Sequence, residues 1–188
     1  HRSLRFGNVM NPAIAHIENL DALPFPAWDL FPVKTYWQLG YAHGPQEGRY
    51  LALQTSRGCT NTCRFCVLPA TNNRHWRGRS PENVLAEMKH WHETMGVREF
   101  HIEDVNPTLD GDRLARLGDL IKQQGLPFIW KFASGTKLET LSAQSLRAMV
   151  AGGCRYVSFS PESGSNRVLT LMDKRFDHAH GLTMTREM

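Results

Sequence analysis

The sequence lacks the long apolar run that a membrane-spanning helix requires. No segment of its 188 residues approaches the roughly 20 consecutive apolar residues needed to cross a bilayer. Low-complexity tracts are missing as well, and the polar and basic first ten residues do not resemble a signal peptide. With 41% hydrophobic and 21% charged residues, the composition is ordinary for a globular protein.

Strong charge of one sign is also missing. The formal net charge is +4, and the basic residues gather only locally, at Arg74, Arg77 and Arg79. This mild excess suits an acidic substrate, but without a long basic run or an RNA-binding motif we do not expect nucleic acid as the partner. Because the chain begins at His1 rather than at Met, we expect a fragment of a longer protein.

Cysteine is scarce, and its distribution is uneven. Three of the four cysteines fall between Cys59 and Cys66, and the fourth is Cys154. A disulfide framework would scatter them more widely, so the tight group indicates a metal site in a reducing compartment. We therefore expect the protein to be cytoplasmic.

Residues 1–50 are expected to form an irregular arm. Pro24, Pro26 and Pro32 interrupt a stretch that is rich in aromatic residues. Proline lacks a backbone donor and fixes φ, which disfavours a helix through this stretch. Its apolar residues suggest that the arm packs along a neighbouring surface.

From residue 50 onward, predicted strands and helices alternate. Short apolar strands are expected at residues 51–55, 100–102, 127–132 and 156–160. Ser80, Asp110 and Ser142 are candidate N-caps of the helices that follow the first three strands, and a fourth helix carries Val168 and Leu169. Four β/α units in a row predict an α/β fold with a parallel sheet and right-handed crossovers.

Polar side chains with catalytic potential follow all four predicted strands. The cysteine loop follows the first strand, Glu103 and Asp104 the second, Ser134 the third, and Glu162 and Ser163 the fourth. The carboxyl ends of parallel strands meet at one edge of the sheet, where α/β folds bind their ligands. We therefore expect these residues to converge on one site.

The cysteine loop reads Cys59-Thr-Asn-Thr-Cys63-Arg-Phe-Cys66. Thiolates suit both iron–sulfur clusters and zinc, but a structural zinc site needs four protein ligands and this loop supplies three. Three thiolates on a four-iron cluster leave one iron open to a small molecule. Cys154 precedes the fourth strand, so we expect it at the opposite end of the sheet as a buried structural residue, while His75 remains a candidate for zinc.

The spacing Cys-x₃-Cys-x₂-Cys after a short strand, with an aromatic residue before the last cysteine, resembles the radical S-adenosylmethionine (radical SAM) superfamily. The resemblance runs from about Leu51 to Arg175. It implies a [4Fe–4S] cluster bound by Cys59, Cys63 and Cys66, whose open iron binds SAM. It further implies reductive cleavage of SAM to methionine and a 5′-deoxyadenosyl radical.

The resemblance also implies roles around SAM for the first two strand ends. Phe65 matches the aromatic residue that usually lies beside the adenine. Glu103 and Asp104 match the strand end that contacts the amino group of SAM, where a carboxylate suits an ammonium donor.

The third and fourth strand ends contribute further residues by the same resemblance. Ser134 corresponds to a polar position near the cofactor. Glu162 and Ser163 belong to a Glu-Ser-Gly-Ser segment whose side chains contact the ribose or carboxylate of SAM, although Pro161 departs from the residues common there.

Within the superfamily, residues 19–30 and 153–159 look like those of the cobalamin-dependent subgroup. This resemblance implies that residues 1–50 link an upstream cobalamin-binding domain to residues 51–188, an incomplete radical SAM core. The core is expected to be a partial (β/α) barrel, truncated after about four β/α units. The chain itself shows no cobalamin-binding motif.

The function implied is that of a cobalamin-dependent methyltransferase or ring-rearranging enzyme. Its partners would be a small-molecule, lipid or natural-product substrate and a reducing electron donor such as flavodoxin or ferredoxin. Two alternatives stay open: a methylthiotransferase that modifies tRNA, and a non-catalytic zinc-binding module.

Overall fold

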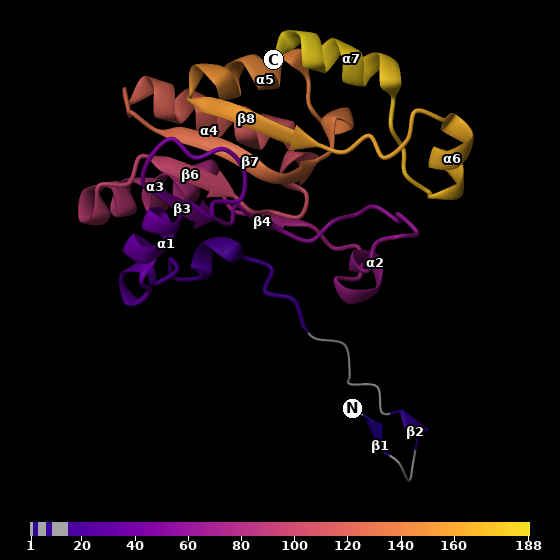
Figure 1. Ribbon diagram of the computed structural model, residues 1–188, viewed down its shortest axis with the longest axis horizontal. Coiled ribbons are helices and arrows are strands. Elements are labelled where there is room, and N and C mark those ends of the chain that lie inside the picture. The colour runs from indigo at the N-terminus through magenta and orange to yellow at the C-terminus, as the bar shows by residue number, and fades with distance from the viewer. Residues whose placement is uncertain (1, 4–6, 9–14) are drawn as a thin grey trace.

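A computed structural model describes residues 2–3, 7–8 and 15–188 of the chain. The remaining part of the predicted arm, residues 1, 4–6 and 9–14, lies outside the described residues. Figure 1 shows the arrangement of the helices and strands.

Four parallel strands form the central sheet, in the order β3-β6-β7-β8. Strands that are consecutive in this order along the chain are also adjacent in the sheet, and all are parallel, as predicted. The four strands are β3 (Tyr50–Leu53), β6 (Glu99–Ile102), β7 (Ile129–Thr136) and β8 (Cys154–Phe159). The fold is therefore α/β, with an open parallel sheet.

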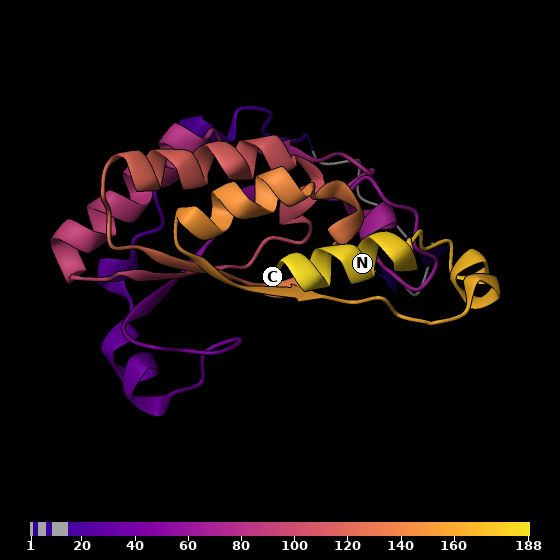
Figure 2. The same ribbon diagram turned by 90° about the horizontal axis from the view of Figure 1, so that it is seen from above.

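Three helices connect these strands and lie on one face of the sheet (Figure 2). They are α3 (Pro81–Met95), α4 (Gly111–Gln123) and α5 (Ala143–Ala151). The predicted caps Ser80, Asp110 and Ser142 each accept a hydrogen bond from a backbone N–H of the first helical turn. Satisfying these otherwise unpaired donors fixes where each helix begins.

The face of the sheet beneath these helices is apolar. Strand residues that alternate along the chain point toward the helices and are almost completely buried, as a period of two requires. They are Leu51, Leu53, Phe100, Ile102, Trp130 and Phe132. Leu114, Leu117 and Ile121 of α4 complete this core from the helical side.

Two helices follow the last strand. The predicted fourth helix is the short α6 (Asn166–Leu171), and α7 (His178–Glu187), which the sequence pattern did not predict, follows it. Asp177 caps α7 through hydrogen bonds from the backbone N–H groups of Ala179 and His180. His180 of α7 contacts the carbonyl oxygen of Leu138 at 3.0 Å, so this helix packs back onto the body of the chain.

The arm is less irregular than predicted. It contains two single-turn 3₁₀ helices at Leu20–Ala22 and Trp28–Leu30 and one α-helix, α1 (Val33–Leu39). The expectation of an irregular arm is therefore wrong for α1, which begins directly after Pro32. Pro32 lies just before the first residue of α1, so its missing backbone donor does not interrupt the hydrogen bonds of the helix.

The rest of the secondary structure consists of short elements, among them 3₁₀ helices at Pro107–Leu109 and Leu138–Thr140. Strands β1 (Arg2–Ser3) and β2 (Gly7–Asn8) pair antiparallel, as do β4 (Ser56–Arg57) and β5 (Arg77–Gly78). Helix α2 (Leu68–Thr71) lies between β4 and β5. Within the described residues, no helix has the length and apolarity needed to cross a membrane.

Candidate functional site

The cysteine loop is a long excursion whose two ends are held together. It leaves the sheet after β3, and its base is closed where β4 pairs with β5. The backbone N–H of Arg79 also donates to the carbonyl oxygen of Thr55 at 2.9 Å. The three cysteines therefore extend from a fixed base at the carboxyl end of β3.

A buried carboxylate fixes the first residues of this base. Asp104 has no exposed surface, and its oxygens accept hydrogen bonds from the backbone and hydroxyl of Thr55 and from the hydroxyl of Ser56, each at 2.6 Å. Burial raises the pKa of Asp104, and these hydrogen bonds together with Arg113 offset part of that rise by favouring the ionised form.

The structure shows a contact of Asp104 that the sequence did not predict. Its oxygens face the base of the cysteine loop and hold Thr55 and Ser56 in place, while its expected contact with SAM stays a prediction. The sequence showed two acidic residues at a strand end; successive side chains of an extended segment point to opposite faces, and only the packing shows which one is buried.

Arg113 of α4 binds both ends of the cysteine loop. Its guanidinium donates to the carbonyl oxygens of Thr55, Arg79 and Pro107 at 3.3 Å and lies 5.5 Å from the ring centre of Trp76. Burial lowers the pKa of Arg113, although Asp104 opposes this shift. Nothing in the sequence pattern marked Arg113, because its partners lie in three separate segments.

Glycine is required directly before the first cysteine. Gly58 has a φ of +91°, and a Cβ atom there would lie 1.9 Å from the carbonyl oxygen of His75. The close approach of the outgoing and returning segments thus leaves no room for a side chain.

Cys59, Cys63 and Cys66 are all free and partly buried on this loop. Burial is the main cause that raises the pKa of Cys63; Lys137 and Lys174 lower it, while Cys59 and Cys66 raise it further. Among the described residues, no three His, Cys, Asp or Glu side chains surround a single-ion position. A four-iron cluster holds each thiolate on a different iron, so its ligands need not converge on one point.

The surroundings of Cys59 suit an anionic sulfur ligand. Amide groups of Asn61 and Asn106 donate toward its Sγ atom at 3.1 and 3.6 Å. Asn106 is only 2% exposed, and its Oδ1 atom has no partner. The loop thus provides three soft ligands, one of them with donors already in place, which fits an iron–sulfur cluster.

Cys154 lies at the amino end of β8, as predicted, and is almost completely buried. Burial raises the pKa of its thiol to about 12. A protonated, buried thiol behaves as a small apolar side chain, which agrees with the predicted structural role.

The expected SAM-binding residues of the first two strand ends differ in their surroundings. The ring of Phe65 is 56% exposed beside the cysteines and is free to contact a ligand. Glu103, directly after β6, is partly exposed and accepts a hydrogen bond from His43 of the arm at 2.8 Å.

Ser134 connects the third strand to the second, since its hydroxyl donates to the carbonyl oxygen of Asp104 at 3.0 Å. This bond brings the ends of β6 and β7 together, as the predicted convergence requires. Ser134 lies inside β7, which extends to Thr136, beyond the strand end expected from the sequence.

Glu162 and Ser163 lie on the segment between β8 and α6. Glu162 has a φ of +65° and binds Lys174 through its carboxylate at 2.8 Å. The hydroxyl of Ser163 accepts the backbone N–H of Ser165 at 3.1 Å. The backbone of this region reaches the cysteine loop at the end of α6, where the N–H of Arg64 donates to the carbonyl oxygen of Met172 at 2.9 Å.

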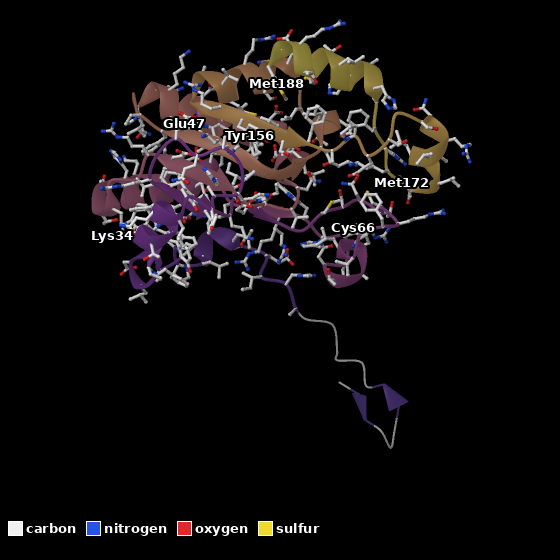
Figure 3. The ribbon with its side chains drawn as sticks, viewed as in Figure 1. Lys34, Glu47, Cys66, Tyr156, Met172 and Met188 are labelled. Carbon is white, nitrogen blue, oxygen red and sulfur yellow. The ribbon has the colours of Figure 1, made fainter. Side chains whose placement is uncertain are left out.

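Figure 3 shows Cys66 and Met172 at the same end of the molecule, away from Glu47 and Tyr156. The cysteine loop and the end of α6 thus lie side by side. That Glu162 and Ser163 share one site with the cysteines stays a prediction.

The face of the sheet opposite the helices carries a buried ionic network. Glu99 of β6 binds the Nε2 atom of His101 at 2.7 Å and the Nζ atom of Lys131 at 3.0 Å. Lys131 also binds Glu47 of the arm at 2.9 Å, and the ring of Tyr50 stacks on His101. The arm residues after α1 therefore pack against this face of the sheet, opposite the helices.

Comparison with known families decides which class of enzyme this site belongs to. Residues 53–180, which include the cysteine loop and all later strand ends, match the Radical SAM superfamily. The chain belongs to the radical SAM superfamily. It is thus part of an enzyme family, as the cysteine spacing indicated.

Two relatives are methyltransferases by name. An uncharacterized methyltransferase of Pyrococcus horikoshii is 34% identical over 169 residues, covering 89% of this chain and 35% of the relative. Cytidylyl-2-hydroxyethylphosphonate methyltransferase of Streptomyces wedmorensis is 34% identical over 167 residues, covering 88% of this chain and 31% of the relative. The chain therefore spans about a third of the length of these relatives.

The fold is similar to that of a solved radical SAM methyltransferase, TsrM from Kitasatospora setae, whose structure has cobalamin and a [4Fe–4S] cluster bound. The TM-score is 0.65 at 17% sequence identity, and the match covers 80% of this chain and 30% of TsrM. At this identity the likeness confirms the α/β fold.

Proposed function

We propose that the chain is the cluster-binding and SAM-binding core of a cobalamin-dependent radical SAM enzyme that methylates or rearranges its substrate. The observation that carries this proposal is the loop of Cys59, Cys63 and Cys66 at the carboxyl ends of the parallel strands. The amide of the buried Asn106 directed at Cys59 supports a cluster, because it favours an anionic sulfur there.

The individual residues then have defined tasks. The three cysteines bind the cluster, and Phe65, Glu103, Ser134, Glu162 and Ser163 surround SAM. When bound and reduced, the cluster supplies the electron that cleaves SAM to methionine and a 5′-deoxyadenosyl radical. Asp104 acts as a positioning residue, because it fixes the base of the cysteine loop.

The choice of a cobalamin-dependent methyltransferase rests on the relatives. Two are methyltransferases by name, and the similar structure of TsrM holds cobalamin. Cobalamin would be bound by an upstream domain, for which residues 1–50 serve as a linker. The substrate is a small molecule, lipid or natural product, and a flavodoxin or ferredoxin supplies electrons in the cytoplasm.

Anaerobic reconstitution of the 188-residue chain with iron and sulfide tests the cluster and its binding of SAM. After reduction with dithionite, we expect an EPR signal of a [4Fe–4S] cluster that changes when SAM is added. The variants Cys59→Ala, Cys63→Ala and Cys66→Ala should lose the cluster, whereas the matched control Cys154→Ala should retain it.

Other outcomes would replace this proposal. Stoichiometric zinc without iron or sulfide would show a zinc-binding module. A cluster indifferent to SAM would contradict the SAM site. Copurifying RNA with salt-sensitive binding would favour the methylthiotransferase that acts on tRNA.

A further inference from the structure

The three cysteines of the site differ in the hydrogen bonds that their side chains receive. The Sγ atom of Cys59 has two amide donors, Nδ2 of Asn61 at 3.1 Å and Nδ2 of Asn106 at 3.6 Å. In the described part of the chain, no side-chain donor reaches the sulfur of Cys63 or Cys66 in this way. The polar environment of the three ligands is therefore asymmetric.

The first donor is connected to a positive charge. The Nζ atom of Lys137 donates to Oδ1 of Asn61 at 3.1 Å, on the far side of the amide from Cys59. A cation on the carbonyl oxygen polarises the amide, and connected hydrogen bonds strengthen one another. Lys137, Asn61 and Cys59 thus form a hydrogen-bonded chain that ends at one sulfur.

The second donor is held in place by its surroundings. Asn106 is 2% exposed, and its backbone carbonyl oxygen accepts the indole N–H of Trp76 at 3.0 Å. Trp76 lies where the cysteine loop returns to the sheet, so the loop itself fixes this asparagine. A buried donor that is already oriented loses little conformational entropy when it binds an anion.

These contacts have a defined consequence for a cluster bound at the site. Reduction adds one negative charge that is shared by the iron, the sulfide and the thiolate sulfurs. Hydrogen bonds to sulfur and nearby positive charge stabilise the reduced state more than the oxidised state, and both raise the reduction potential.

We propose that Asn61, Asn106 and Lys137 are positioning residues that raise the reduction potential of the cluster through Cys59. This inference rests on the proposed function, because it requires that a [4Fe–4S] cluster be bound by Cys59. It adds a means by which the protein sets how readily its electron donor can reduce the cluster.

The test is an EPR-monitored redox titration of the reconstituted 188-residue chain, performed without SAM. The variants are Asn61→Leu and Asn106→Leu, which keep the branched shape of the side chain but remove the donor, and Lys137→Met, which removes the charge. Lys122→Met on the exposed side of α4 is the matched control for the loss of a lysine.

We expect each leucine variant to shift the equilibrium toward the oxidised cluster about tenfold, which is a decrease of about 59 mV for one electron. Lys137→Met should also decrease the potential, because it removes the positive charge bound to the amide oxygen of Asn61. The control should have the potential of the unmodified chain.

The outcomes separate this inference from the proposed function. A chain that binds no cluster overturns both. If the cluster responds to SAM but keeps its potential in the Asn61 and Asn106 variants, only the role of these residues is overturned. A higher potential in these variants would overturn that role as well. If both leucine variants lose the cluster, Lys137→Met decides the question, because it leaves all three thiols and both asparagines in place.

Discussion

The two faces of the central sheet are built from opposite kinds of side chains. Beneath α3, α4 and α5 the strands present apolar residues such as Phe100 and Trp130, whereas the opposite face carries Glu99, His101 and Lys131. These five side chains are all 2% exposed or less. The apolar face is stabilised by removal of surface from water, while the polar face depends on each charge having a partner.

This difference determines what each face tolerates. Packing energy on the apolar face changes with the volume of a side chain. On the polar face, loss of the cation leaves a buried carboxylate without its lysine counter-ion, whereas loss of both charges can be nearly neutral. Four experiments examine this contrast, in order of decreasing effect.

The largest effect is expected on the apolar face. Trp130→Ala removes a fully buried ring and the hydrogen bond from its indole to the carbonyl oxygen of Gly152. We expect a loss of about 4 kcal/mol in the free energy of unfolding, measured by urea denaturation. The control is Trp28→Ala, because Trp28 of the arm is only partly buried. It should lower the free energy of unfolding clearly less than Trp130→Ala. Equal losses would contradict the assignment of the core.

The polar face should respond to loss of a single ion. Lys131→Met leaves Glu99 and Glu47 without their shared cation, and we expect a loss of about 3 kcal/mol in the free energy of unfolding. The double variant Lys131→Met with Glu99→Leu should recover most of this loss. If the double variant is as unstable as the single variant, the unpaired charge is not the cause.

Acid should weaken the polar face selectively. Burial opposes ionisation of Glu99, but hydrogen bonds from His101 and Lys131 outweigh it and lower the pKa of Glu99 from its ordinary value of 4.5. The ionised group therefore stabilises the fold above pH 4.5, and this contribution is lost as the pH falls through the lower folded pKa.

Unfolding curves between neutral pH and acid measure this effect. The Glu99→Gln variant should be less stable at neutral pH, and its stability should fall less steeply below pH 4.5 than that of the unmodified chain. Parallel pH profiles would show that Glu99 does not contribute this dependence.

The smallest effect is expected for an exposed ion pair. Arg116 and Glu82 lie 3.2 Å apart between α4 and α3, with both side chains more than half exposed. Solvent screens this pair, so Arg116→Ala should cost less than about 1 kcal/mol, and 1 M salt should remove the difference. A loss as large as that of Lys131→Met would refute the claim that burial separates the two classes of pair.

Part of this organisation was predictable from local sequence. The caps Ser80, Asp110 and Ser142 and the buried alternation in the strands follow from hydrogen bonding and periodicity within a few residues. The spacing of Cys59, Cys63 and Cys66 likewise indicated the family, because all three ligands lie on one short loop. The end of the chain was predicted less well, because α7 has no strong apolar periodicity and packs through its contacts with other segments.

The sequence by itself determined the order of the β/α units and the three thiols on one loop, since both depend on neighbours along the chain. Only the tertiary structure decided that Asp104 anchors that loop while Glu103 remains accessible, and that Asn106 reaches Cys59. Residues 59 and 106, like residues 99 and 131, come from separate segments. Their contacts depend on how parallel strands and their connections pack, and no local sequence pattern encodes contacts between residues so far apart along the chain.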